Sequence, residues 1–331
     1  MTATCIVYTE QAYRMSRGLA HGWTLLVALT YGATLALMPG EGLLDRENYL
    51  TYLDIAPILI LDWTNAEILK ILSNEPLWIL INAGIGQFFP REQSLQILIF
   101  VPAVIVAYCT LRFDRRYALM LFIFLLLPQI LKNHVVHLRQ GFGIAIFLVG
   151  WFARSPQWRW GFWFLTPLLH SSFFFVILML CISRVCQYWR LVLPVTWTGF
   201  LLAGLLGAFG LEQIARTMGA RQSAESVITS TVDVSGLGFL LWLLALMLLL
   251  VQTNSFKRAH SFEIGTVLFY LATYFLSPFS ARVFESTLSV VLLAGLRMRG
   301  LGRTIFLATM VAFGAFQWLM IYQGGGVFFE N

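Results

Sequence analysis

The feature that most constrains this chain is a succession of apolar runs separated by short polar clusters. The hydrocarbon core of a bilayer is ~30 Å thick, so a helix that crosses it needs about 17–25 mostly apolar residues. Runs of this kind fill most of the 331 residues, of which 59% are hydrophobic and only 11% are charged. The sequence therefore predicts an all-α, polytopic integral membrane protein, with one transmembrane domain over residues 1–331.

The apolar runs predict about ten transmembrane helices. They cover residues 18–38, 95–111, 117–131, 141–153, 160–182, 191–209, 236–251, 264–276, 283–296 and 304–322. Arg14 and Arg17 precede the first run, which places the N-terminus in the cytoplasm by the positive-inside rule. The net charge of +6 comes from short basic clusters between runs, so we expect contacts with membrane lipids and no nucleic-acid partner.

Two segments leave the topology open. Residues 77–89 are too few to cross, and residues 160–182 are interrupted by Thr166-Pro167 and His170-Ser171-Ser172. If 77–89 is re-entrant and 160–182 is a hairpin of two half-helices, the basic clusters mostly lie inside. If both segments cross, the middle of the chain inverts and residues 112–116 lie outside. The positive-inside rule favours the first arrangement.

Two polar regions are predicted to lie outside. Residues 40–93 hold eight Asp and Glu residues against three Lys and Arg residues, with two short apolar pieces at 55–61 and 77–89. Such pieces are typical of interfacial or re-entrant helices. Residues 211–235 form the second region, an outer polar loop.

Metal and disulfide sites are not predicted. The four cysteines, Cys5, Cys109, Cys181 and Cys186, have neither metal-ligand spacing nor the pattern of a disulfide framework. His134 and His137 are three residues apart, but no third ligand is evident. We therefore expect no metal and no cofactor.

Arg139 is a charged residue at the start of the predicted span 141–153. An arginine within a membrane costs at least ~2.5–3.5 kcal/mol on insertion scales, so it usually faces a cavity and has a function. Its planar guanidinium can bind two phosphate oxygens at once. The sequence therefore predicts that Arg139 binds an anion; the alternative is a side chain that snorkels from a helix end to the interface.

Four motifs occur in a recognisable order. They are Asn48-Tyr49-x-x-Tyr52, Glu75-Pro76-Leu77-Trp78-x-x-x-Asn82, Arg139-Gln140-Gly141-x-Gly143-x-Ala145 and His170-Ser171-Ser172. Together they resemble the EpsG-type, Wzy-like polysaccharide polymerases, well over residues 40–180 and loosely in the C-terminal third. Arg282, which opens a late span, also fits. The chain departs from the pattern at Asn48, where an aspartate is expected, and at Ala281, where an acidic residue usually precedes the late arginine.

The resemblance implies an enzyme at the outer face of a bacterial inner membrane. It would join oligosaccharide repeat units carried on undecaprenyl pyrophosphate, and a chain-length regulator is a candidate partner. A ligase that transfers a finished glycan would share this chemistry. A flippase or transporter of the same lipid-linked oligosaccharide is a further alternative, although transporters often show internal repeats, and this chain shows none.

The implied reaction assigns roles to particular side chains. Arg139 and Arg282 would stabilise the leaving pyrophosphate, and the candidates for a general base are His137, His170, Glu75 and Asp54. Substrate binding is expected from His137, Gln140, Asn48, Tyr49, Tyr52, Trp63 and Trp78. Structural alternatives exist: Glu75 could cap the helix that begins at Pro76, His170 could be a hydrogen-bonded packing residue, and the tyrosines could belong to an interfacial belt.

Overall fold

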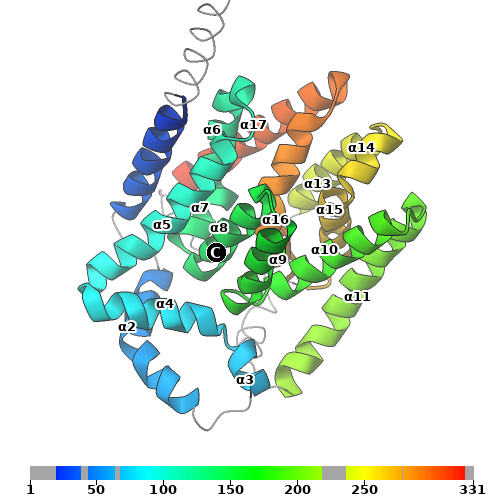
Figure 1. The fold of residues 1–331 in the computed structure, drawn as a ribbon. Coiled ribbons are helices and arrows are strands. Elements are labelled where there is room, and N and C mark those ends of the chain that lie inside the picture. The colour runs from blue at the N-terminus through cyan, green and yellow to red at the C-terminus, as the bar shows by residue number, and fades with distance from the viewer. Residues whose placement is uncertain (1–19, 39–43, 64–67, 218–235, 278, 325–331) are drawn as a thin grey trace, which may run out of the picture.

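The computed structural model describes residues 20–38, 44–63, 68–217, 236–277 and 279–324 of the chain (Figure 1). All regular secondary structure in these ranges is helical, as the sequence predicts. A first helix covers residues 20–36. The helices that follow are α2 (Leu44–Asp62), α3 (Ile68–Ser73), α4 (Pro76–Phe88), α5 (Arg91–Leu111), η2 (Arg115–Tyr117), α6 (Ala118–Leu125), α7 (Pro128–Val135), α8 (Leu138–Phe152), α9 (Pro156–Leu165), η3 (Thr166–Leu168), α10 (Phe173–Tyr188), α11 (Leu193–Thr217), α13 (Gly236–Leu250), α14 (Asn254–Ala259), α15 (Ser261–Thr273), α16 (Phe279–Arg297) and α17 (Gly300–Gln323).

Three helices, α5, α16 and α17, are long and apolar enough to cross a membrane. A fourth span results if the bent pair of residues 115–125 and 128–135 is counted as one. In the described ranges, shorter apolar helices of 10–17 residues account for other predicted spans, including α8, α10, α13 and α15. The structure thus supports a membrane protein with several apolar helices, and it does not confirm about ten full spans.

The predicted span 117–131 is broken into α6 and α7, which meet at 66°. Pro128 opens α7, and the missing N–H of proline ends the preceding helix. Other helices supply partners for the carbonyls at the break. The Tyr31 hydroxyl donates to Leu125 O and Trp318 Nε1 donates to Leu126 O, each at 2.9 Å. A helix broken at membrane depth needs such partners because no water reaches its backbone.

The helix α8 lies at the centre of the bundle, in contact with α5, α7, α9 and α16 (Figure 1). Its first two glycines allow this close packing. A Cβ at Gly141 would overlap the carbonyl oxygen of Asn133 in α7, and a Cβ at Gly143 would overlap the ring of Phe173 in α10. The Gly-x-Gly spacing after Arg139 therefore has a structural cause: it brings α7 and α10 against the helix that carries the arginine.

Residues 156–188 are divided into two helices, α9 and α10, by the polar segment that was predicted to interrupt them. The break between α9 and α10 falls at Thr166 to Ser172, where His170 N–H donates to Thr166 O at 3.1 Å. Arg159 in α9 and Arg184 in α10 both lie over the ring of Trp163, each at 5.9 Å. Trp151 near the end of α8 lines the same cavity as Arg184 and Gln187, so the end of α10 lies close to the end of α8, after which α9 begins.

The basic clusters gather at one end of the helices, which we call the basic end. Arg297 lies over the ring of Phe113 at 4.6 Å, and Arg303 donates to the Tyr117 hydroxyl at 2.6 Å, so clusters that are far apart in sequence meet there. Shared cavities and contacts connect the arginines of this end, which include Arg112, Arg115, Arg116, Arg154, Arg159, Arg184, Arg190, Arg258, Arg297, Arg299 and Arg303. This grouping agrees with the favoured topology, in which these clusters share one side of the membrane.

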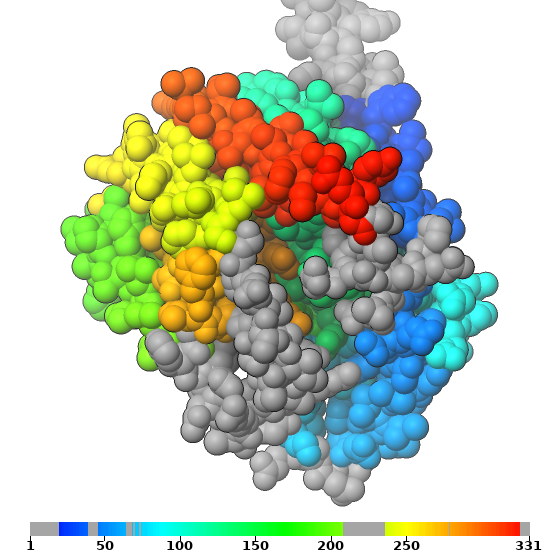
Figure 2. Space-filling view, turned by 180° about the vertical axis from the view of Figure 1, so that it is seen from behind, coloured from blue at the N-terminus to red at the C-terminus, as the bar shows by residue number. Residues whose placement is uncertain are grey.

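The outer surface of the bundle is apolar. The helix α17 lies across this surface (Figure 2). The buried share of its most apolar 18-residue stretch is 17%, whereas the same share is 78% for α16. Leu301, Leu319 and Met320 are among its exposed side chains. Soluble monomers rarely expose apolar patches of this extent, so this surface is consistent with contact with lipid.

The acidic region 40–93 is more helical than predicted. The helix α2 covers 19 residues, whereas only 55–61 were predicted as an apolar helical piece. The predicted piece 77–89 corresponds to α4, which begins one residue earlier. The helix α11 continues to Thr217, so the first part of the predicted loop 211–235 is helical. Residues 218–235 of that loop lie outside the described ranges.

Candidate active site

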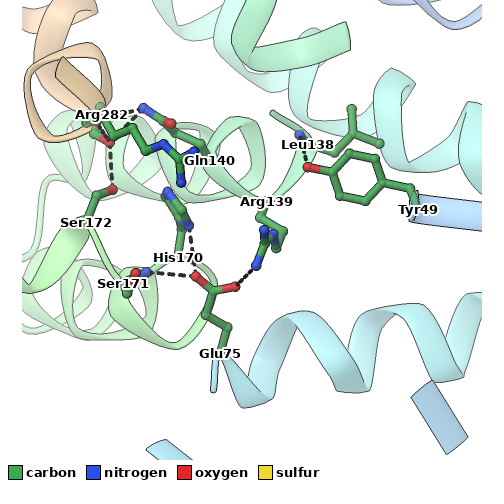
Figure 3. Close-up of polar contacts among 10 residues, drawn as sticks. Tyr49, Glu75, Leu138, Arg139, Gln140, His170, Ser171, Ser172 and Arg282 are labelled. Carbon is green, nitrogen blue, oxygen red and sulfur yellow. Dashed lines mark hydrogen bonds and ion pairs between the residues drawn. The ribbon is translucent and has the colours of Figure 1, made fainter. Parts of the chain in front are cut away.

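Glu75 is the centre of a buried polar cluster, where its carboxylate faces Arg139 and His170 (Figure 3). Its carboxylate accepts from Arg139 Nη1 at 2.7 Å, from His170 Nδ1 at 2.9 Å and from the backbone N–H of Ser171 at 3.1 Å. Only 3% of Glu75 is exposed. Two of the other three predicted catalytic residues therefore contact Glu75 directly, although all three come from different parts of the chain.

The backbone of Glu75 holds its carboxylate in this position. Glu75 precedes α4 with a φ of 57°, in the left-handed region that non-glycine residues rarely adopt. Its side chain makes no capping hydrogen bond to α4. Glu75 is thus the N-cap residue of α4 by position, but its carboxylate contacts Arg139, His170 and Ser171 instead of the first turn of the helix. A strained backbone of this kind costs of order 1–3 kcal/mol and persists only where surrounding contacts compensate for it, as the three contacts of the carboxylate do here.

The contact with Glu75 determines the tautomer of His170. A carboxylate can only accept, so Nδ1 carries the proton and donates it to Glu75. In neutral imidazole this leaves the lone pair on Nε2. His170 is 6% exposed, and its Nε2 has no hydrogen-bond partner among the residues that the structure describes. A buried acceptor without a partner is costly, so this nitrogen is a candidate contact for a substrate group.

Arg282 and Gln140 lie on the other side of His170. Figure 3 shows the Arg282 side chain extending from α16 toward His170 and Gln140. Gln140 Nε2 donates to the backbone oxygen of Arg282 at 2.8 Å and to Ser286 Oγ at 3.1 Å. These bonds tie the start of α8 to the start of α16. They hold Arg139 and Arg282 near the same histidine.

Two serines complete this link. The Ser286 hydroxyl donates to Arg282 O at 2.8 Å, so it accepts from Ser172, whose Oγ lies 3.0 Å away. Ser171 and Ser172 belong to a predicted motif, but no motif indicated Ser286. The one available signal for Ser286 was its place one helical turn after Arg282, which puts both on the same face of α16.

Aromatic residues pack against the start of α8, next to Arg139. The Tyr49 hydroxyl accepts from Leu138 N–H at 3.1 Å, at the start of α8. Trp78 is fully buried between the rings of Tyr49 and Phe142, with both centroid distances at 5.8 Å. These contacts position α2 and α4 against α8, and the packing of Trp78 leaves no face of its ring for the predicted sugar stacking.

The remaining predicted residues differ in their surroundings. Tyr52 is buried in the apolar core, and Asn48 is exposed on α2. His137 immediately precedes α8 and is half-buried. Asp54 pairs with Arg91 at 3.1 Å, and both side chains are more than half exposed. Asp54 is therefore a poor candidate for the base that Glu75 and His170 could provide together.

The electrostatics of the site favour an ionised Glu75. Burial by itself raises the pKa of this carboxyl, but the positive charge of Arg139 and the hydrogen bonds from His170 and Ser171 outweigh it. The net effect holds the pKa of Glu75 well below its usual range. With His170 neutral, two guanidinium groups and one carboxylate leave one positive charge, which suits an anionic ligand.

Among the described residues, no group of three or more His, Cys, Asp and Glu side chains could hold a metal ion. The groups present are a histidine with an oriented lone pair, a carboxylate that stabilises its protonated form, and two arginines. Such a set can accept a proton from a hydroxyl while it binds a phosphate group. Comparisons of the chain with protein-family models, with curated proteins and with solved structures found no match.

Proposed function

We propose that this protein is a membrane glycosyltransferase that polymerises oligosaccharide repeat units carried on undecaprenyl pyrophosphate. The observation that carries the proposal is the buried cluster of Glu75, His170 and Arg139, with Arg282 directed toward the same histidine. The resemblance to Wzy-like polymerases supplies the substrate class, and the outer face of a bacterial inner membrane is the corresponding location. Glycan ligation is the alternative with the same chemistry.

In this proposal His170 is the general base. Its Nε2 takes the proton of the acceptor hydroxyl as the hydroxyl oxygen attacks the anomeric carbon of the donor. The imidazolium that forms is stabilised by the carboxylate of Glu75, 2.9 Å from Nδ1. General-base catalysis of this kind contributes typically ~10²–10⁴-fold to a rate.

The arginines act on the leaving group. As the new glycosidic bond forms, the bond from the anomeric carbon to the pyrophosphate breaks and its electron pair remains on the phosphate oxygen. Arg139 and Arg282 stabilise that negative charge. Arg139 is also the ion-pair partner of Glu75, which in turn contacts His170. The residues that bind the pyrophosphate and the residue that accepts the proton are therefore connected through Glu75.

The test is an analysis of surface glycan from a strain that lacks this gene, complemented with wild-type protein or variants. The proposal requires loss of the high-mass ladder in the deletion strain while single repeat units still reach the outer surface. His170→Ala and Arg139→Ala should fail to restore the ladder, and Arg139→Lys should restore little of it because lysine lacks the bidentate fork.

Two outcomes would contradict the proposal. Lipid-linked units trapped on the inner face would indicate a flippase. A full ladder with Arg139→Ala, at normal protein levels, would remove the arginine from the mechanism. Asp54→Asn is the matched control, since it neutralises an exposed carboxylate whose ion pair lies outside the buried cluster.

A further inference from the structure

A second polar site lies at the basic end, where α10 ends and α11 begins (right of Figure 1). Two cavities adjoin there, of about 330 and 390 Å³, and both are lined by Gln187 and Arg258. Arg184 lines the smaller cavity and Arg190 the larger one. This site is separate from the cluster around Glu75, because α10 runs for 16 residues, about 24 Å, between them.

Hydrogen bonds between α10 and α15 build the floor of these cavities. Ser183 Oγ and Ser261 Oγ are 2.7 Å apart, and Gln187 Nε2 donates to Ser261 Oγ at 2.9 Å and to Arg258 O at 3.1 Å. The guanidinium of Arg258 donates to Leu191 O at 3.2 Å. The walls are therefore held in place by the protein itself, as a preformed binding site requires.

The charge of the site is positive. Three arginines line the two cavities, against one carboxylate, that of Glu263. Glu263 is 5% exposed and lies 3.0 Å from His260 Nδ1, so a neighbour on its own helix already contacts it. Arg184 also lies over the ring of Trp163, which restricts its guanidinium. All three arginines are exposed and line the cavities, where their guanidinium groups can bind phosphate oxygens.

Arg190 occupies a position that normally favours glycine. The last turn of α10 closes with Leu191 N–H donating to Cys186 O at 2.9 Å and Arg190 N–H donating to Gln187 O at 3.2 Å. This is the Schellman motif, whose penultimate residue adopts the left-handed conformation. Arg190 has a φ of 50° there. Arg190 therefore combines a left-handed backbone with a place in the lining of the larger cavity.

We propose that these two cavities form a binding site for a phosphate-bearing ligand, with Arg184, Arg190 and Arg258 as its cations. The site does not depend on the function proposed for the cluster around Glu75. Two sources supply the same chemistry: the headgroup of an anionic phospholipid in the adjacent leaflet, or a soluble phosphate compound.

The experiment uses the full chain in nanodiscs of phosphatidylcholine with and without phosphatidic acid. Native mass spectrometry would count the phosphatidic acid molecules retained, and thermal unfolding would be followed while inorganic phosphate is added. Arg190→Gly is the informative variant because glycine suits the left-handed backbone, so the protein should fold at least as well while it loses the charge. Arg184→Gln is a second variant, and Arg115→Gln removes one charge at the same end outside the cavities.

We expect Arg190→Gly and Arg184→Gln each to weaken binding about tenfold, and Arg115→Gln to leave it unchanged. Retention of phosphatidic acid without an effect of phosphate would identify a lipid headgroup, and stabilisation by phosphate without lipid retention would identify a soluble ligand. Absence of both effects in the wild-type protein would overturn the proposal. Equal weakening in Arg115→Gln would also overturn it, since binding would then reflect surface charge alone.

Discussion

Replacement of Glu75 by glutamine should destabilise the protein strongly, although the change in shape is small. The carboxylate accepts three hydrogen bonds, from Arg139, His170 and Ser171, and it is 3% exposed. A glutamine amide has one acceptor oxygen, so its NH₂ group must face one of these donors. Removal of one partner from a buried ion pair typically costs ~3–5 kcal/mol. The Arg139 side chain is 20% exposed and regains some hydration, so we expect the lower end, about 3 kcal/mol.

The assay is reversible unfolding of the purified protein in mixed micelles, with Asp54→Asn as the matched control. Asp54 and Arg91 form an ion pair at 3.1 Å, but their side chains are 54% and 56% exposed. Exposed pairs contribute about 0–1 kcal/mol, so Asp54→Asn should leave the free energy of unfolding nearly unchanged. Both variants remove one negative charge by the same chemical change, and only the burial differs.

A double-mutant cycle separates the ion pair from the rest of the cluster. Arg139→Gln alone leaves Glu75 buried without its cation, whereas the double variant removes both charges. The double variant should therefore be less destabilised than the sum of the single variants, by about 2 kcal/mol. Equal, small effects of Glu75→Gln and Asp54→Asn, or strictly additive effects in the cycle, would refute this account of the site.

Three further predictions concern pH, packing and topology. The pKa of Glu75 is lower in the folded protein than the unfolded value of ~4.3, so the stability that this carboxylate contributes is present above that pH and is lost as the pH falls below it. The Glu75→Gln variant lacks the carboxylate, so its stability should fall less with decreasing pH than that of the wild-type protein. Identical acid-unfolding curves for the two proteins would contradict this prediction. Gly141→Ala should lower stability by ~1–3 kcal/mol because the new Cβ would overlap with α7. Gly84→Ala should raise stability by up to about 1 kcal/mol, since the space around Gly84 is open and alanine favours a helix. Thermal unfolding of both variants measures this difference. Single cysteines at Glu92 and Arg115, in a background without the native cysteines, should react with impermeant reagents from opposite sides of the membrane, because α5 spans about 32 Å between them. Labelling of both from one side would mean that α5 does not cross.

The helical class and the main breaks of this chain follow from local sequence. Continuous apolar runs can satisfy their backbone only as helices in a membrane, which excludes most other folds. The polar segment from Thr166 to Ser172 separates α9 from α10 as predicted. The break at Pro128 was not predicted, since residues 117–131 were expected to form one span, although the missing N–H of proline explains it. Arg139 could be identified as a candidate from local sequence as well, since an arginine at an apolar membrane helix has a high free-energy cost.

The partners of these residues depend on packing between distant segments. Glu75 lies 64 residues from Arg139 and 95 from His170 in sequence, and no periodic pattern connects them. Their contact required the segment between α9 and α10 to lie against α4, and the glycines of α8 to admit α7 and α10. Packing also determined their contacts: the carboxylate of the N-cap residue Glu75 accepts hydrogen bonds from other helices instead of capping α4, and Trp78 packs between two aromatic rings. The sequence determined which groups were too costly to bury without partners, and only the tertiary structure decided which partners they found, because pairing across helices depends on interhelical distance and desolvation.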